Sequence, residues 1–167
     1  MALTSKLTLS LSADQTNALD LATGSLPLKV RDVVDLANGT GANQADQIFS
    51  DRRTIAASGT DVLDLAGVLT DAFGASITFA RVKALFVSAA AANTNNVNVV
   101  QDATAGAPLF LAAGDGVPVR PGGMFLWVAP DATAAAVTAG TADLINMVNS
   151  GAGSTVTYDV VIIGASA

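Results

Sequence analysis

The stretch Leu7-Thr-Leu-Ser-Leu-Ser12 alternates leucine with hydroxyl residues, so in an extended chain all three leucines point to the same side. A period of two predicts a β-strand with one buried face. Short apolar runs follow at residues 17–22 and 28–36. The first strand is also a good candidate for pairing across a subunit boundary. The alternation interrupts the apolar sequence, so this start lacks the continuous apolar region of a signal peptide.

From residue 37 to residue 53 the apolar pattern lapses into polar, glycine-containing sequence in which Ile48 and Phe49 are the only large apolar residues. A stretch of this length predicts a long polar loop or arm, which either docks on a partner or is a flexible surface loop. We therefore expect N-terminal strands and an extended arm or loop region over residues 1–53. Residues 54–167 are expected to form a β-sandwich core, and the two parts to make one structural unit.

The rest of the chain reads as short strands separated by turns. In the run Ile77–Val87 large apolar residues fall on both faces, which predicts a bulge or a central strand buried on both sides. The polar run 93–96 predicts a hairpin-like connection. Strands about every ten residues favour an antiparallel β-sandwich or jelly roll with little helix. The other expected strands are 54–57, 61–65, 97–100, 108–111, 117–120, 124–129, 135–138, 144–148 and 155–163.

The chain of 167 residues has no His and no Cys, and all 14 of its acidic residues are Asp. Imidazole titrates near neutrality and thiolates are ready nucleophiles, so most common catalytic groups are absent. Zinc, copper and iron-sulfur sites also depend on these side chains. We therefore expect a non-enzymatic protein and assign no catalytic, cofactor-binding or metal-binding residue. An Asp-pair glycosidase is the one chemistry within easy reach of this composition.

Charged residues make up only 13% of the chain, against roughly 25% in an ordinary domain, whereas apolar residues reach 51%. A weakly charged exterior is typical of a subunit whose faces pack against neighbours. The net charge of −6 argues against nucleic-acid binding, which needs clustered Lys and Arg. No uninterrupted apolar stretch of about 20 residues argues for a membrane span.

Three polar or aromatic features have both a functional and a structural interpretation. Asp61 and Asp64, with Asp71 nearby, could bind calcium, although their spacing does not match a calcium loop and Asp at strand ends commonly forms turns. The triplet Asp51-Arg52-Arg53 could make an ion pair between subunits or lie in a solvated loop. Trp127 could stack on a sugar, but an aromatic residue in an apolar strand more often packs in the core.

Five further segments carry motifs of packing and turns, and they are Asp51–Gly67, Leu69–Gly74, Phe79–Leu85, Val119–Gly123 and Tyr158–Gly164. Together these segments resemble a family of small virion structural proteins of tailed bacteriophages. The resemblance extends from about Asp46 to the C-terminus.

The resemblance implies a virion protein made in the cytoplasm of a host bacterium. We expect a capsid decoration or cement protein, a β-sandwich that binds the major capsid protein and itself as a homo-oligomer, expected to be a trimer. A tail component, such as a fibre, adaptor or baseplate subunit, stays open. A lectin-like host-binding module is a further alternative.

Overall fold

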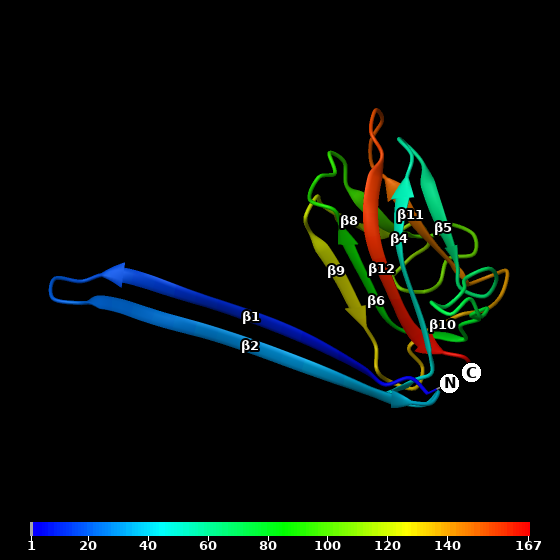
Figure 1. Ribbon diagram of the computed structural model, residues 1–167, viewed down its shortest axis with the longest axis horizontal. Helices are drawn as coiled ribbons and strands as arrows, with labels where there is room; N and C mark the ends of the chain where they lie inside the picture. The colour runs from blue at the N-terminus through cyan, green and yellow to red at the C-terminus, as the bar shows by residue number, and fades with distance from the viewer. Residues whose placement is uncertain (1) are drawn as a thin grey trace.

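The computed structural model describes residues 2–167, and over this range it contains twelve β-strands and no helix. Two parts are visible in Figure 1. A long two-stranded ribbon, β1 (Ser5–Ala18) and β2 (Thr23–Asn38), projects from a β-sandwich that holds the remaining strands. We call the ribbon the arm and the sandwich the body. The expected all-β class is confirmed.

The body consists of two sheets that face each other. The first, the β12 sheet, contains β4 (Gln47–Ile55), β12 (Val156–Ala165), β6 (Arg81–Ala89), β9 (Met124–Val128) and the short β10 (Ala135–Ala136). The second, the β11 sheet, contains β5 (Thr60–Asp64), β11 (Leu144–Asn149), β7 (Val97–Gln101) and β8 (Gly116–Val119). A two-residue strand, β3 (Gln44–Ala45), pairs with the end of β2 at the base of the arm.

The order of the strands is that of a jelly roll. In the β12 sheet the order is β4, β12, β6, β9, and in the β11 sheet it is β5, β11, β7, β8. If these eight strands are lettered B to I along the chain, the sheets read BIDG and CHEF. All of these pairs are antiparallel, and all except β7 with β8 join strands that are not consecutive in the chain. The body therefore has the double Greek-key arrangement expected from the sequence.

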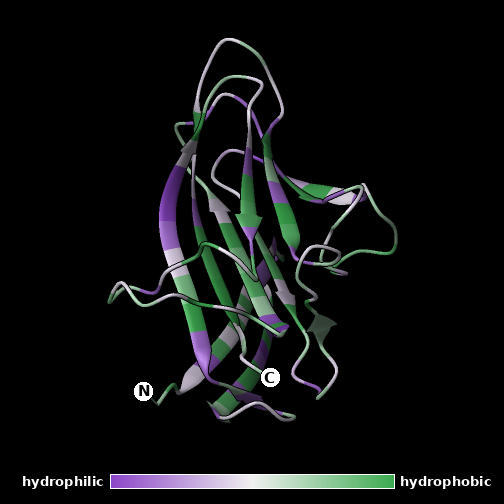
Figure 2. Cartoon of the chain, turned by 90° about the vertical axis from the view of Figure 1, so that its right-hand side faces the viewer, coloured by the Kyte–Doolittle hydropathy of each residue, from purple (hydrophilic) through white to green (hydrophobic). Residues whose placement is uncertain are grey.

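The main core lies between the two sheets. Alternate residues of each strand point into it, and Figure 2 shows hydrophobic segments alternating with hydrophilic ones along the body strands. Tyr158 is the largest side chain that is fully buried. Other fully buried members come from both sheets and include Leu63, Leu85, Val99, Ile145, Met147 and Ile162.

The bulge expected near Ile77–Val87 is present in β6. Ile163 pairs with Ala84 and Gly164 pairs with Val82, so Lys83 has no partner on β12. A side chain at Gly164 would collide with the Arg81 carbonyl oxygen and the Phe79 ring, which explains the glycine there. Apolar residues on both faces of β6 are buried, because Leu85 and Val87 pack in the main core and Ala84 packs in a second, smaller core on the opposite face.

The long polar loop expected over residues 37–53 is much shorter. Only residues 39–43 form a turn, and β4 begins at Gln47. The inward face of β4 carries Phe49, Asp51, Arg53 and Ile55, as its pairing with β12 shows. The two charged residues in the middle of that face interrupt the alternation of apolar residues, so the sequence did not show the period of two that is typical of a strand. The division at residue 53 therefore falls inside β4, and the arm ends at Asn38 instead.

Two smaller expectations also need correction. Residues 93–96 do form a turn, but they connect β6 to β7, which lie in different sheets, so the connection is not a hairpin. Residues 108–111, expected as a strand, form bends instead, although Leu109 is buried in the main core. Burial in the main core accounts for Leu109 and in part for Phe110, whereas Leu111 is fully exposed.

Candidate interaction surface

The arm has one apolar and one polar face. Its strands pair without interruption from Ser5 and Leu36 at the base to Ala18 and Thr23 near the tip. Residues directly opposite each other share a face of the ribbon. One face, which we call the apolar arm face, carries Leu7, Leu9, Leu11, Ala13, Leu26, Leu28, Val30 and Val34, with Asp32 as its one charged residue. The other carries Lys6, Thr8, Ser10, Ser12, Asp14, Lys29, Arg31 and Asp35.

Most of the apolar arm face is open to solvent. The exposed fractions are 54% for Leu9, 51% for Leu11, 70% for Leu26, 53% for Leu28 and 42% for Val30. At the tip, Leu19 and Leu21 are exposed as well. A two-stranded ribbon with no further cover is marginally stable in water. A continuous apolar surface of this kind marks a site of interaction.

The strand expected at Leu7–Ser12 is therefore confirmed, but its leucine face is not buried within the chain beyond Leu7. Within the chain its hydrogen-bonding partner is β2, and because β1 is the outer strand in the order β1-β2-β3, pairing of its other edge with another subunit stays a prediction. The sequence alternation identified the apolar side of the strand. It carried no information on what covers that side.

The base of the arm is packed on the outer face of the β12 sheet. Leu36, Ala45, Ala84 and Ile163 form a second, smaller core there, and Leu7 and Val34 of the arm pack against it. Hydrogen bonds hold the base in place. The Leu3 amide donates to Asn38 Oδ1 at 2.8 Å, and the Ala37 amide donates to the Asn43 carbonyl at 2.9 Å. The arm thus leaves the body at a fixed point.

Lys83 helps to hold the base of the arm in place through hydrogen bonds. Its side chain is fully buried, and its ammonium donates to the carbonyl oxygen of Gly41 at 3.2 Å and to that of Asp131. Burial lowers the pKa of Lys83 from its ordinary value. The bulge in β6 places this lysine under the turn at residues 39–43, so it ties the turn that follows the arm to the loop after β9.

The apolar arm face continues onto the outer face of the body. The row of the β12 sheet nearest the arm consists of Val128, Ala84, Ile163 and Ile48, and the next consists of Leu126, Phe86, Val161 and Ser50. The third row is more polar, with Met124, Ser88, Asp159 and Arg52. The outer face is therefore apolar where it meets the arm and polar farther away.

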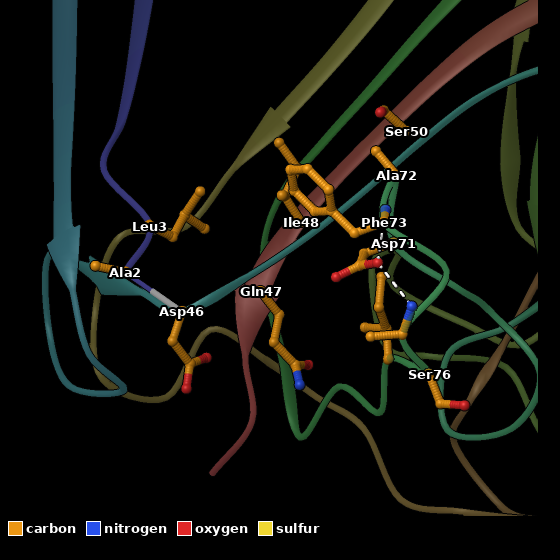
Figure 3. Close-up of a pocket in the computed structure, with 12 residues that line it drawn as sticks. Ala2, Leu3, Asp46, Gln47, Ile48, Ser50, Asp71, Ala72, Phe73 and Ser76 are labelled. Carbon is orange, nitrogen blue, oxygen red and sulfur yellow. Dashed lines mark hydrogen bonds between the residues drawn. The ribbon is translucent and has the colours of Figure 1, made fainter.

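Beside β4 this apolar surface opens into a groove of about 650 Å³, shown in Figure 3. Phe73 and Ile48 face it, with exposed fractions of 79% and 38%. Asp71 shapes the loop that presents Phe73, because its carboxylate accepts hydrogen bonds from the amides of Phe73 at 2.9 Å and Ala75 at 2.8 Å. Leu3, just before the arm, also lines the groove. The groove and the arm are thus neighbours.

The arginine of the Asp51-Arg52-Arg53 triplet that faces inward links the two sheets. The Arg53 guanidinium donates to both oxygens of Asp61 on β5, at 2.6 and 2.8 Å, and Tyr158 donates to Asp61 Oδ2 at 2.9 Å. The hydrogen bonds from Arg53 hold the pKa of Asp61 below its ordinary value. Burial, followed by the charge of Asp61, raises the pKa of Tyr158. This cluster closes the edge of the sandwich between β4 and β5.

The triplet forms ion pairs within the chain, and the ion pair between subunits that it suggested stays a prediction. Arg52 pairs with Asp159 on the neighbouring strand at 2.6 Å, and Arg53 also donates to Asp51 at 3.0 Å. Both arginines therefore have partners within the chain. Asp51 and Asp61 share Arg53 instead of facing each other across a cleft, so this pair lacks the arrangement of glycosidase carboxylates.

The carboxylates considered for calcium are not brought together. Asp61 binds Arg53, Asp64 accepts a hydrogen bond from the Ala66 amide at 3.0 Å, and Asp71 caps its own loop. Within residues 2–167 no three acidic side chains are grouped in a way that could hold a metal ion. The turn-forming interpretation is the one that fits Asp64 and Asp71.

Trp127 lies on β9 with its side chain packed against the main core, as does Phe125 on the same face. The Phe125 ring stacks on that of Phe110 with 6.1 Å between centroids. The packing interpretation therefore accounts for Trp127.

Two features of this surface were not predicted from the sequence. One is Phe73, and the other is the alternation of apolar and other residues along β2, opposite the leucines of β1. That alternation is visible in the sequence as Leu26, Leu28 and Val30, separated by Pro27 and Lys29.

No family model, curated protein or solved structure matches this chain. The part of the chain that the structure describes contains no helix that is long and apolar enough to cross a membrane.

Proposed function

We propose that this protein is a non-enzymatic structural subunit of a bacteriophage virion, and that it decorates and braces the capsid as a cement protein. On this proposal it binds the major capsid protein and further copies of itself, as a trimer, with neither nucleic acid nor membrane as a partner. It is made in the cytoplasm of the host bacterium and ends in the particle.

The observation that carries the proposal is the arm. Its 14-residue first strand corresponds to about 45 Å of extended chain. A compact domain of the body's size is about 35 Å across. An arm longer than the body, with leucine on one face, serves no purpose inside the chain, since only its base is packed. Proteins that clamp an assembly use such extensions to reach over neighbours, where many weak contacts combine into strong attachment.

The chemistry of the body supports a binding role over a catalytic one. The carboxylates that could act in hydrolysis are engaged by Arg53 or by turn amides. The chain contains no histidine and no cysteine to take their place. The jelly roll is common in viral capsid proteins and in lectins, which is compatible with the proposal but does not select a function by itself. The resemblance to small virion proteins favours a place in the phage particle.

Cryo-electron microscopy of the phage particle that carries this protein tests the proposal. Symmetric clusters of jelly-roll density on the capsid lattice are the expected result. A matched particle without the gene is expected to lack this density and to lose DNA at lower temperature. Density confined to the tail would move the protein to a fibre, adaptor or baseplate role. Absence from the particle would reject a virion function.

A further inference from the structure

The surface area of the chain is too large for a free compact monomer. A folded protein of 16.6 kDa is expected to expose about 7,600 Å², whereas this chain exposes 9020 Å². The excess of about 1,400 Å² arises because the ribbon projects from the body and exposes both of its faces. A standard protein interface removes about 800 Å² from each partner. The excess is therefore large enough for the ribbon to form an interface of standard size with a partner.

The chain carries both halves of such an interface. The apolar arm face, centred on Leu9, Leu11 and Val30, projects away from the body and is mostly exposed. The groove beside β4 is concave, and its exposed Phe73 and Ile48 have no cover within residues 2–167 that shields them from solvent. Burying two such surfaces against each other removes both from water at once.

The position of the groove favours an arm as its occupant. The groove extends to Ala2 and Leu3, immediately before β1 (Figure 3). An arm that docks there lies beside the base of the receiving copy's own arm. The apolar surface then runs from one copy to the next without a break. The upper part of the same β4 edge carries Asp51, Arg52 and Arg53, and charged edge residues discourage other strands from pairing there.

We propose that the apolar arm face docks on a second copy of this chain, in the groove formed by Ile48 and Phe73, so that copies join arm to groove in a closed ring. The contact is heterologous, because the arm of one copy meets a different surface of the next. This deepens the proposed function, which requires self-association, but it can fail or hold on its own.

The test uses two complementary variants of the full chain. Leu9→Ser combined with Leu11→Ser removes the arm's anchors but leaves the groove intact. Phe73→Ser removes the groove's exposed ring but leaves the arm intact. Native mass spectrometry of the wild-type chain is expected to show a ring. Each variant alone is expected to be a single copy, with its dissociation constant raised at least tenfold by loss of a central anchor.

Mixing the two variants gives the decisive result. The arm variant keeps an intact groove, and the groove variant keeps an intact arm. One arm-to-groove contact can therefore form between them, and the mixture is expected to yield a heterodimer that adds no further copies. A mixture that stays as single copies overturns the proposal. A wild-type chain that is itself a single copy also overturns it, as does a Phe73→Ser chain that keeps the wild-type ring.

Controls separate docking from folding. All three residues are exposed, so thermal unfolding followed by circular dichroism is expected to be unchanged in both variants. Leu111→Ser alters another exposed leucine that lies outside both surfaces, and it is expected to keep the ring. Thr8→Ala with Ser10→Ala alters the polar face of the same strand and is expected to keep it too.

The outcomes also separate this inference from the proposed function. A chain that remains a single copy in solution and still decorates the capsid would refute the docking between copies and leave the capsid role. A chain that forms the ring by arm and groove but is absent from the particle would leave the docking and refute the virion role.

Discussion

The arm and the body use the same sequence rule and end in opposite situations. In β12 of the body, Val156, Val160 and Ile162 alternate with other residues and are almost completely buried between two sheets. In β1 of the arm, Leu9 and Leu11 alternate as regularly, yet each is about half exposed. Alternation specifies which side of a strand is apolar. Only a second layer decides whether that side is buried, and within residues 2–167 no second layer covers most of the arm.

The largest effect is expected when a leucine is truncated in the body. Leu85→Ala removes a fully buried side chain from the main core and is expected to lower the free energy of unfolding by about 2–5 kcal/mol, because a cavity remains. Leu11→Ala is the matched change in the arm. It is expected to alter the unfolding of the single copy by less than about 0.5 kcal/mol.

Urea unfolding monitored by tryptophan fluorescence and circular dichroism measures this pair, at protein concentrations low enough to keep single copies. If the two substitutions lower the free energy of unfolding equally, the arm contributes to the stability of the single copy as much as the body does. That result would contradict the difference between the two regions.

The cluster that joins the two sheets gives the next largest effect. Asp61→Asn removes the charge that binds Arg53 and accepts from Tyr158, and is expected to lower the free energy of unfolding by about 2 kcal/mol at neutral pH. Since the pKa of Asp61 is lowered in the folded state, its contribution is present above the unfolded pKa of about 3.9. The contribution is lost as the pH falls through the lower folded pKa.

Urea titrations of wild type and Asp61→Asn at pH 7 and near pH 2 measure this pH dependence. The difference between their free energies of unfolding is expected to be large at pH 7 and smaller in acid. A difference that stays constant with pH would show that the carboxylate charge does not stabilise the edge of the sandwich. Asp159→Asn, at an exposed pair with Arg52, is the control and is expected to change stability by less than about 1 kcal/mol.

A more local effect is expected at the base of the arm. Lys83→Met keeps the length of the side chain but leaves the carbonyl oxygens of Gly41 and Asp131 without this donor, which is expected to cost about 1–3 kcal/mol. Hydrogen exchange is expected to quicken at residues 37–45 and to stay unchanged in β7 and β11. Uniformly faster exchange throughout the body would contradict a role confined to the arm's base.

The smallest effect on folding is expected from removing most of the arm. Replacing residues Leu9–Asp32 by Asn-Gly joins Thr8 to Val33, which already face each other in the ribbon, through a two-residue turn suited to a hairpin. The small core around Leu36 and Ile163 is kept. The thermal midpoint of the body is expected to change little, whereas self-association is expected to disappear.

The sequence predicted the body better than the arm. Turn residues between short apolar runs were enough to predict a jelly roll, and apolar residues on both faces of Ile77–Val87 predicted the bulged central strand β6. β4 was missed because Asp51 and Arg53 occupy inward positions, and their partners Asp61 and Tyr158 are distant in the sequence. Phe73 was missed because nothing local distinguishes an exposed aromatic in a turn from a buried one.

On our proposal the body is complete in one chain, whereas the arm is completed by a second copy. Sedimentation equilibrium of the full chain, beside the chain with the shortened arm, measures this difference. The full chain is expected to sediment as a ring whose mass is a whole multiple of 16.6 kDa, and the shortened chain as a single copy that melts at the same temperature. A full chain that remains a single copy at every concentration would refute docking between copies, as would a shortened chain that still associates.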